Sequence, residues 1–300
     1  MLAARLSPYL LVTLAPLFWS GNFVLGRALA DVIPPIALSF WRWALALLIV
    51  LPFTLPRVLA QAGLIRRHLG VLTLLGLLGV ANFNTFVYLG LQTTTATNAV
   101  LLQSTTPVLI VALSYLLLRE AVSLRQALAI LVSLLGVGTI VLQGEPARLA
   151  GLALNRGDLW VLAAVLSWAL YSVCLRWRPA QIEPLVFLTA TIAAGVLVLL
   201  PLYLWELSRG GGFALNAVSL GAVGYVALFP SVLAYVFWNR AVAELGASRT
   251  GQFLHLMPVF GTLLAVLLLG ERMRGYHLLG IALIAGGIWL AAVRGRLRGP

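Results

Sequence analysis

Residues 104–120 read STTPVLIVALSYLLLRE, and residues 255–271 read HLMPVFGTLLAVLLLGE at an offset of 151. The two stretches share a Pro-Val step near the start, three consecutive leucines and the final glutamate. The match runs without a gap through residues 86–142 and 237–293. Leucine matches are common in an apolar chain, but proline, glutamate and glycine matched at one offset are not. We interpret the match as an internal duplication, so the two halves are predicted to share one fold.

The composition is typical of a membrane protein. The 300 residues are 62% hydrophobic and 9% charged, with a mean hydropathy of +1.03, whereas soluble domains are about 45–50% apolar and about 25% charged. The net charge of +12 is spread over many connections, so we expect lipid and not nucleic acid as a partner. All twenty basic residues are arginines, which excludes lysine chemistry, and the single cysteine excludes a disulfide framework.

Ten apolar runs are long enough to cross a bilayer as helices, because a hydrocarbon core about 30 Å thick needs about 20 apolar residues. The runs are continuous rather than alternating, which favours helices over a β-barrel. They lie near residues 8–28, 35–56, 69–89, 95–118, 124–142, 158–176, 183–204, 216–239, 248–269 and 275–293. The sequence therefore predicts an all-α membrane protein with ten transmembrane helices and no soluble domain.

The duplication divides these helices into a five-helix repeat at residues 1–146 and a second at residues 147–300. Five is odd, so the second repeat is predicted to be inverted in the membrane relative to the first. Inverted repeats are typical of transporters, whose substrate site lies near the midplane between the repeats. We therefore expect a transporter that works by alternating access and not an enzyme. A duplicated scaffold or a membrane-embedded enzyme is the alternative interpretation.

The arginines also orient the chain. If the N-terminus is cytoplasmic, thirteen arginines fall on the cytoplasmic side, six fall on the outer side and Arg42 lies within a span. Cytoplasmic connections are enriched in arginine and lysine, so both termini are predicted to be cytoplasmic. The first apolar run follows Arg5 and is too long for the core of a signal peptide, so we interpret it as the first helix.

Several short motifs, taken in order, resemble a known family. They are Trp19-Ser20-Gly21-Asn22-Phe23, Phe40-Trp41-Arg42, and Ser104-Thr105-Thr106-Pro107 leading to Glu120, with Met257-Pro258 and Gly270-Glu271 in the second half. In this order and spacing the chain resembles the EamA family of the drug/metabolite transporter superfamily, and within it the YddG-type amino acid exporters. The resemblance implies an exporter of aromatic and other neutral amino acids, or related metabolites, in the bacterial inner membrane.

Aromatic residues on the first, third, sixth and eighth helices offer the apolar part of a substrate site, because their rings can stack on a planar side chain. At an offset of 149, Trp168 repeats Trp19. Gly21 and Asn22 are replaced by Leu170 and Tyr171, which argues against a symmetric role for the first and sixth helices.

Arg42 is the one charge well inside a span, about 10 Å from the outer end of its helix. Intramembrane charges are functional candidates by default. Arg42 either holds a substrate carboxylate or closes an outer gate, or else it snorkels to the surface or pairs with Asp31. The second interpretation is slightly favoured, because an arginine near a helix end can reach the interface.

Other polar residues lie in the spans. Asn82, Asn98 and Gln103 belong to the third and fourth helices, where a bond between helices is as natural as contact with a ligand. His255 lies in the middle of the ninth helix and could bind a proton, a substrate or a neighbouring carbonyl group. No aspartate or glutamate lies mid-span, which favours facilitated diffusion, with His255 the one residue that could couple a proton.

The predicted substrate-binding residues are Trp19, Asn22, Phe23, Arg42, Asn82, Phe83, Phe86, Asn98, Gln103, Trp168, Tyr171, Tyr235 and His255. No catalytic residue, metal ligand or cofactor is expected, because no catalytic triad, HExxH motif or metal-ligand cluster occurs. We expect a monomer that carries a small-molecule substrate. The alternative functions are a lipid-linked carrier flippase, an exporter of another small metabolite on the same fold, and a channel.

Overall fold

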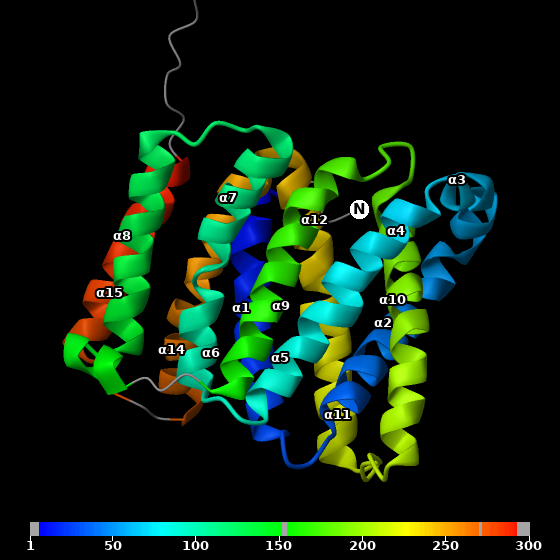
Figure 1. Ribbon diagram of the computed structural model, residues 1–300, viewed down its shortest axis with the longest axis horizontal. Coiled ribbons are helices and arrows are strands. Elements are labelled where there is room, and N and C mark those ends of the chain that lie inside the picture. The colour runs from blue at the N-terminus through cyan, green and yellow to red at the C-terminus, as the bar shows by residue number, and fades with distance from the viewer. Residues whose placement is uncertain (1–5, 152–154, 270–271, 293–300) are drawn as a thin grey trace, which may run out of the picture.

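The computed structural model describes residues 6–151, 155–269 and 272–292. Within these residues every regular element is helical and no strand occurs. Most helices stand side by side in one bundle (Figure 1). Eight helical segments in the described ranges are long and apolar enough to cross a membrane: Pro8–Ala28, Pro35–Ala60, Leu69–Leu91, Asn98–Leu118, Leu124–Val141, Arg156–Trp177, Pro184–Ser208 and Ala217–Leu245. The predicted all-helical fold with membrane spans is therefore confirmed.

The long helices follow one another in the same order in each half, and the short elements between them differ. The first half contains α1 (Pro8–Ala28), α2 (Pro35–Ala60), α3 (Ala62–Arg67), α4 (Leu69–Gly76), η2 (Leu77–Asn82), α5 (Phe83–Leu91), α6 (Ala96–Gln103), α7 (Thr106–Leu118), α8 (Leu124–Val141) and η3 (Pro146–Gly151). The second half contains α9 (Arg156–Cys174), η4 (Leu175–Trp177), α10 (Pro184–Ser208), α11 (Ala217–Val226), η5 (Ala227–Leu233), α12 (Ala234–Leu245), α13 (Ala247–Gly251), η6 (Gln252–His255), α14 (Leu256–Leu269) and α15 (Gly275–Ala292).

The helices begin where the sequence supplies suitable first residues. Pro35 and Pro184, which match at the offset of 149, each lie in the first turn of a helix, where the missing N–H of proline costs no hydrogen bond. Asn155 caps α9, because its side-chain oxygen accepts hydrogen bonds from the backbone N–H groups of Gly157 and Asp158.

The helix contacts follow one pattern in both halves. The contact of α5 with α9 corresponds to that of α1 with α12, and the contact of α7 with α9 corresponds to that of α1 with α14. In addition, α2 packs against α10, and α8 packs against α15. In Figure 1, α8 and α15 form the left edge of the bundle, and α2 and α10 lie toward the right. The centre therefore lies between α1, α5, α9 and α12. We call the end that holds α3 and the 119–123 connection the upper end, and the opposite end the lower end.

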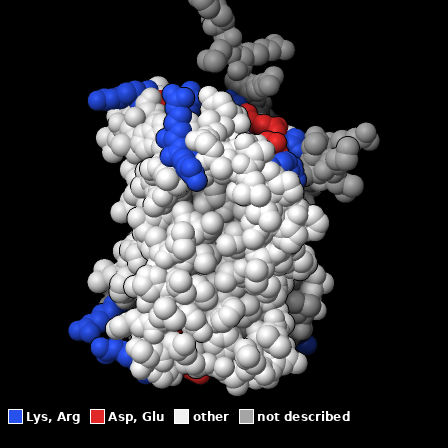
Figure 2. All heavy atoms as spheres, turned by 90° about the vertical axis from the view of Figure 1, so that its right-hand side faces the viewer, with Lys and Arg blue, Asp and Glu red and all other residues white. Residues whose placement is uncertain are grey.

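Charged side chains gather at the two ends of the molecule. On the face that Figure 2 shows, arginines and acidic residues lie near the top and bottom, and a wide band between them carries none. Large apolar side chains are exposed on the helices, among them Leu48, Phe53 and Leu197. An uncharged apolar belt of this kind suits contact with lipid.

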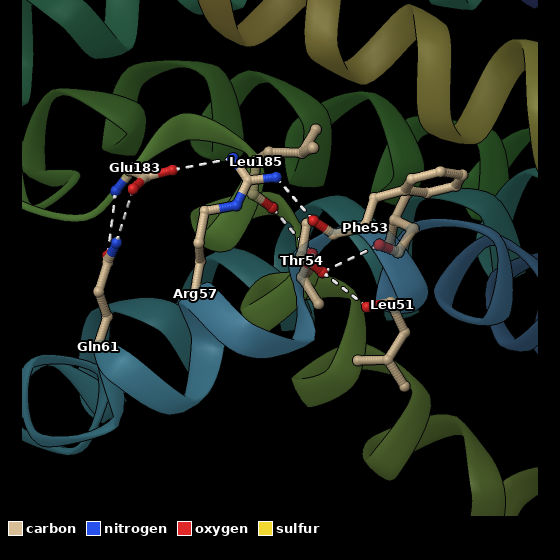
Figure 3. A network of polar contacts seen from close by, with 9 residues as sticks. Leu51, Phe53, Thr54, Arg57, Gln61, Glu183 and Leu185 are labelled. Carbon is tan, nitrogen blue, oxygen red and sulfur yellow. Dashed lines mark hydrogen bonds and ion pairs between the residues drawn. The ribbon is translucent and has the colours of Figure 1, made fainter.

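A polar network joins α2 to the start of α10 near the upper end (Figure 3). Arg57 Nη1 lies 3.2 Å from Glu183 Oε2, and Gln61 Nε2 donates to Glu183 Oε1 over 3.2 Å. Deeper in the bundle, Thr189 Oγ1 donates to Thr54 Oγ1 over 3.0 Å. The ion pair is about half exposed and contributes on the order of 0–1 kcal/mol. The network therefore sets the position of α2 relative to α10 but adds little to the free energy of unfolding.

Gly136 allows α8 and α15 to touch, because a Cβ atom there would lie 2.7 Å from Gly280 O and 2.8 Å from Ile284 Cγ1. We expect Gly136→Leu to lower the free energy of unfolding by about 1–3 kcal/mol, since an overpacked side chain forces the helices apart. Thermal denaturation in detergent measures the effect. Gly138→Leu is the matched control on the same helix, because nothing lies within 4 Å of a Cβ atom there. Equal losses in the two variants would contradict this account.

Candidate functional site

A cavity of about 490 Å³ opens at the upper end of the bundle. The ends of α7, α9 and α12 and the connections after them form its walls. The lining residues are Leu118, Glu120, Ser172, Val173, Leu175, Arg176, Arg178, Ala180, Asn239, Val242, Ala243, Glu244, Leu245, Gly246 and Ala247. The volume lies within the range of about 300–1,000 Å³ that is usual for small-molecule sites.

The cavity walls carry both signs of charge. Glu120, Glu244 and Arg176 are exposed, and Arg178 is half-buried. Burial lowers the pKa of the Arg178 guanidinium, which stacks over a phenylalanine ring of α10 at 5.5 Å. Mixed charges suit a neutral or zwitterionic molecule better than a polyanion, because neither sign dominates the field in the cavity.

The deep part of the cavity is polar but uncharged. Ser172 and Asn239 line it and are almost completely buried. Tyr171 donates its hydroxyl hydrogen to Asn239 Oδ1 over 2.7 Å, whereas Ser172 Oγ makes no hydrogen bond within the described ranges. A molecule that reaches the floor of the cavity therefore meets one free hydroxyl group and one amide.

Beneath this floor lies a set of packed rings, the central aromatic cluster. Trp168 lies at its middle, with ring centroids 4.8–5.5 Å from five neighbouring rings. Trp43 joins through Tyr235 at 4.9 Å. All of these side chains are at most 5% exposed. The cluster consists of Trp19, Trp43, Phe83, Trp168, Tyr171, Tyr235 and Trp238. It includes five of the residues that the sequence singled out.

Two π-helical segments hold the cluster in place. η2 and η5 occupy the same position in the third helix of each half, and a π turn frees backbone carbonyl groups. Gly79 O of η2 accepts a hydrogen bond from the Tyr235 hydroxyl, and Pro230 O of η5 accepts one from Trp19 Nε1 at 3.0 Å. The backbone of each half thereby anchors an aromatic residue of the other half.

Arg42 lies on the far side of the cluster from the cavity, with Cζ 5.2 Å from the Trp43 ring centroid. Its side chain is completely buried, so it does not snorkel to the surface, and its hydrogen bonds do not include Asp31. Nε donates to Ser231 Oγ at 2.8 Å, and Nη1 donates to Asn22 Oδ1, Asn84 Oδ1 and the Tyr88 hydroxyl at 3.0, 2.7 and 2.8 Å. We call these five residues the Arg42 cage.

A tyrosine–asparagine hydrogen bond occurs once in each half, with the tyrosine and the asparagine at exchanged positions. Tyr88 of α5 donates to Asn22 Oδ1 of α1 at 2.6 Å, and Tyr171 of α9 donates to Asn239 Oδ1 of α12 at 2.7 Å. Asn22 and Tyr171 match at the offset of 149, and Tyr88 and Asn239 match at 151. The replacement of Asn22 by Tyr171 therefore keeps the contact between the two helices, although it looked like a loss of symmetry in the sequence.

The fourth helix of each half is interrupted, and the two interruptions meet. α6 and α7 are separated at Ser104, and η6 separates α13 from α14. His255 Nε2 lies 3.0 Å from Ser104 O. Because a carbonyl oxygen only accepts, Nε2 carries the hydrogen, and Nδ1 is left as a buried acceptor without a partner among the described residues. The predicted bond from His255 to a carbonyl group is present, and one ring nitrogen stays available.

At the lower end, the helix ends equivalent to those around the upper cavity are bonded to each other. Arg27 Nη1 donates to Leu91 O at 3.0 Å, and Gln92 Nε2 donates to Ala30 O at 3.1 Å, which closes the end of α1 onto the end of α5. Arg27 matches Arg176 at the offset of 149, and Leu91 matches Val242 at 151. Arg176 and Val242 line the upper cavity. Arg27 and Leu91 are therefore hydrogen-bonded at the lower end, whereas the equivalent residues Arg176 and Val242 line an open cavity at the upper end.

The remaining predicted residues do not all join the centre. Phe23 is buried in the core, and Gln103 is buried with Oε1 unbonded among the described residues. Asn82 ends η2 and is half-buried. Phe86 packs on the exposed Trp160 ring at 5.3 Å, and Asn98 Nδ2 lies 3.5 Å from Asp158 Oδ1 beside the N-terminus of α9.

The predicted set of substrate-binding residues does not include several residues of the site: Trp43, Asn84, Tyr88, Ser172, Ser231, Trp238 and Asn239. The sequence does contain a signal for Tyr88 and Asn239, because these two residues match each other at the offset of 151. Their hydrogen-bond partners, Asn22 and Tyr171, match each other at the offset of 149. Ser231 carries no comparable signal, because its place beside Arg42 depends on the π turn of η5.

The comparison with known families decides the identity of the fold. The model of the EamA-like transporter family matches residues 6–142 and again residues 155–293. The chain belongs to this family. Members of the EamA-like family are transporters, so the chain is a multi-pass membrane transporter, in accord with the expectation that it is not an enzyme.

Relatives of this EamA-like chain are transporters too. It is 28% identical over 291 residues to uncharacterized transporter YyaM of Bacillus subtilis, covering 96% of this chain and 94% of that protein. It is 29% identical over 225 residues to a probable terminal-alkyne amino-acid exporter of Streptantibioticus cattleyicolor, covering 75% of this chain and 73% of that protein. A solved crystal structure at 23% identity superposes with a TM-score of 0.74 over 95% of this chain and 96% of its own, which supports the fold.

Proposed function

We propose that this EamA-like transporter is a YddG-type exporter of aromatic and other neutral amino acids, or related metabolites, in the bacterial inner membrane. Its ten spans would form two inverted five-helix repeats with both termini in the cytoplasm, which makes the upper end the cytoplasmic end. The observation that carries the proposal is the upper cavity, whose lining residue Asn239 accepts a hydrogen bond from Tyr171 of the central aromatic cluster. The named amino-acid exporter among the relatives supports the same substrate class.

The arrangement of the helices supports two inverted repeats. The contact of α5 with α9 is the counterpart of the contact of α1 with α12, and α2 with α10 and α8 with α15 pair helices of equivalent position. The π turns η2 and η5 and the interruptions at Ser104 and η6 also occur at equivalent positions. Two similar packings that face opposite sides of the membrane give a route to alternating access.

Transport in this proposal exchanges the states of the two ends. The substrate enters the upper cavity, meets Ser172 and Asn239, and inserts among the rings of the central aromatic cluster. The upper end then closes in the way that Arg27 now closes the lower end, and the lower end opens. Neutral amide and hydroxyl groups along this path suit neutral amino acids, and the rings favour aromatic side chains.

Counterflow in proteoliposomes tests the proposal. Vesicles that contain the purified protein and are loaded with unlabelled phenylalanine, leucine or lysine receive the labelled amino acid outside. We expect loaded phenylalanine to accelerate uptake of label severalfold and lysine to have no effect, because a carrier exchanges its own substrate across the membrane. A pH gradient in a parallel sample shows whether a proton is coupled. Absence of counterflow with every neutral amino acid of the panel would refute the proposal, and uptake that does not respond to loading would indicate a channel.

A further inference from the structure

Arg42 carries a buried positive charge that no described acidic side chain neutralises. The side chain is completely buried, and the ion pairs of the described residues join Arg57 to Glu183, Arg148 to Glu145 and Arg240 to Glu244. Removing a guanidinium ion from water is costly unless an opposite charge compensates it. A protein that keeps such a charge in its core has a use for it.

Two acidic groups that are buried or half-buried, Glu206 and Asp158, are engaged elsewhere. Glu206 accepts hydrogen bonds from the backbone N–H groups of Ile36 and Ala37 at the start of α2. Arg42 lies at least five residues further along that helix, so about 8 Å of helix separates it from the groups that Glu206 caps. Asp158 accepts from the Thr94 hydroxyl and from the backbone of Asn155.

The partners of Arg42 in the cage are all neutral, and their hydrogen-bonding capacity is largely used. Tyr88 donates to Asn22, and Ser231 donates to Val226 O at 2.6 Å, so each of these hydroxyls accepts from Arg42 and gives its hydrogen elsewhere. The cage orients Nε and Nη1 of the guanidinium. Nη2 makes no hydrogen bond with any described residue. The guanidinium is therefore held in place with one donor edge free.

The Arg42 guanidinium has an aromatic neighbour. Arg42 Cζ lies 5.2 Å from the Trp43 ring centroid, and Trp43 contacts Tyr235 edge-on at 4.9 Å. A carboxylate on Arg42 would thus lie next to the central aromatic cluster. The second half has no such charge, because Thr191 occupies the position that matches Arg42 at the offset of 149.

We propose that Arg42 is a carboxylate-binding residue of this transporter, which takes the α-carboxylate of one substrate molecule while the substrate side chain lies among the rings. The assignment rests on the proposed function and narrows its substrates to monocarboxylates. A carboxylate supplies the missing negative charge, and it accepts from a guanidinium edge more strongly than a neutral group does. The substrate reaches Arg42 from the upper cavity when the central aromatic cluster rearranges.

Thermal denaturation of the purified protein with phenylacetate and with its neutral analogue phenylacetamide tests the assignment. We expect phenylacetate to raise the melting temperature by roughly 5 °C at a hundredfold excess over its Kd, and phenylacetamide to have no effect. Sodium chloride is tested at the same ionic strength. Equal stabilisation by the acid and the amide, or by chloride and phenylacetate, would overturn the assignment.

Asn84→Asp gives a second test that does not depend on the folding of an arginine variant. Asn84 Oδ1 lies 2.7 Å from Arg42 Nη1, so aspartate of nearly the same shape gives the guanidinium an internal counter-ion. We expect this variant to melt at a higher temperature than the wild type and to gain nothing from phenylacetate. Asn216→Asp, in the exposed N-cap of α11, is the control and should respond to phenylacetate as the wild type does. An Asn84→Asp variant that phenylacetate still stabilises would contradict the assignment.

Counterflow of the wild type separates this inference from the proposed function. Stabilisation by phenylacetate without counterflow of any amino acid would refute export and leave the carboxylate site standing. Counterflow of phenylalanine and of phenylalaninamide at the same rate would refute the role of Arg42 and leave export standing.

Discussion

Arg27→Ala and Arg176→Ala are expected to shift the transporter in opposite directions. Arg27 closes the lower end through Leu91 O, and its sequence counterpart Arg176 lines the open upper cavity beside Val242. Loss of Arg27 should favour the state that is open below and closed above. Loss of Arg176 should favour the state seen here, because in the other state Arg176 would donate to Val242 O.

The size of the shift follows from the hydrogen bond that is lost. A hydrogen bond from a charged group contributes about 1.5–3 kcal/mol, which changes the ratio of the two states by about 10- to 100-fold. Maleimide labelling of Val242→Cys, in a background where the natural Cys174 is alanine, reports the opening of the upper cavity. Labelling should slow in Arg27→Ala and not in Arg176→Ala, while counterflow falls in both.

Arg148→Ala is the control for these two variants. Arg148 lies in η3, where its guanidinium pairs with the exposed Glu145 carboxylate and its pKa is raised by that hydrogen bond. The pair is far from both helix-end contacts in the sequence, so neither labelling nor counterflow should change. If Arg27→Ala and Arg176→Ala alter labelling in the same direction, the two arginines do not play reciprocal roles.

Trp168→Ala is expected to cause the largest loss of stability, about 3–5 kcal/mol, because a buried tryptophan leaves a cavity that its neighbours cannot fill. Its indole ring is 1% exposed and contacts five other rings. Chemical denaturation in detergent measures the loss. Trp168→Phe, which keeps a ring in the cluster, should retain most of the stability and still slow transport.

Trp160 provides the matched control on the same helix. It is 42% exposed, and its one described ring contact is with Phe86 at 5.3 Å. Trp160→Ala should cost less than about 1 kcal/mol, as expected for a surface substitution. Similar losses for Trp160→Ala and Trp168→Ala would mean that the central aromatic cluster is not the core of the bundle.

The sequence alone was sufficient to predict an all-helical membrane protein, since long continuous apolar runs specify helices that can cross a bilayer. It also selected Trp19, Trp168 and Tyr235, whose rings pack against one another in the central aromatic cluster. Single side-chain directions were harder to predict. Each π turn inserts a residue and rotates everything after it, so Phe86, beyond η2, faces outward to Trp160 instead of inward.

The environment of Arg42 depends on contacts between segments far apart in the chain. Distance from the helix end favoured a side chain that reaches the surface, but α2 packs against η5, and Ser231 of that segment accepts from Nε. Pro230 indicates a disturbed helix near this point, but the contact between α2 and η5 leaves no mark in the local sequence. The cavity was equally hidden, because Ser172 and Asn239 are ordinary polar residues until the ends of α9 and α12 are seen to separate.

The exchanged tyrosine–asparagine bond bears on how such genes diverge. The donor lies on α5 in one half and on α9 in the other, and the acceptor lies on α1 and on α12, so the bond is present in both halves although the residues at equivalent positions differ. An alignment of the two halves that treats each position separately shows only two unrelated differences. The similarity of two repeats is therefore better measured by comparing pairs of residues in contact than by counting identical residues.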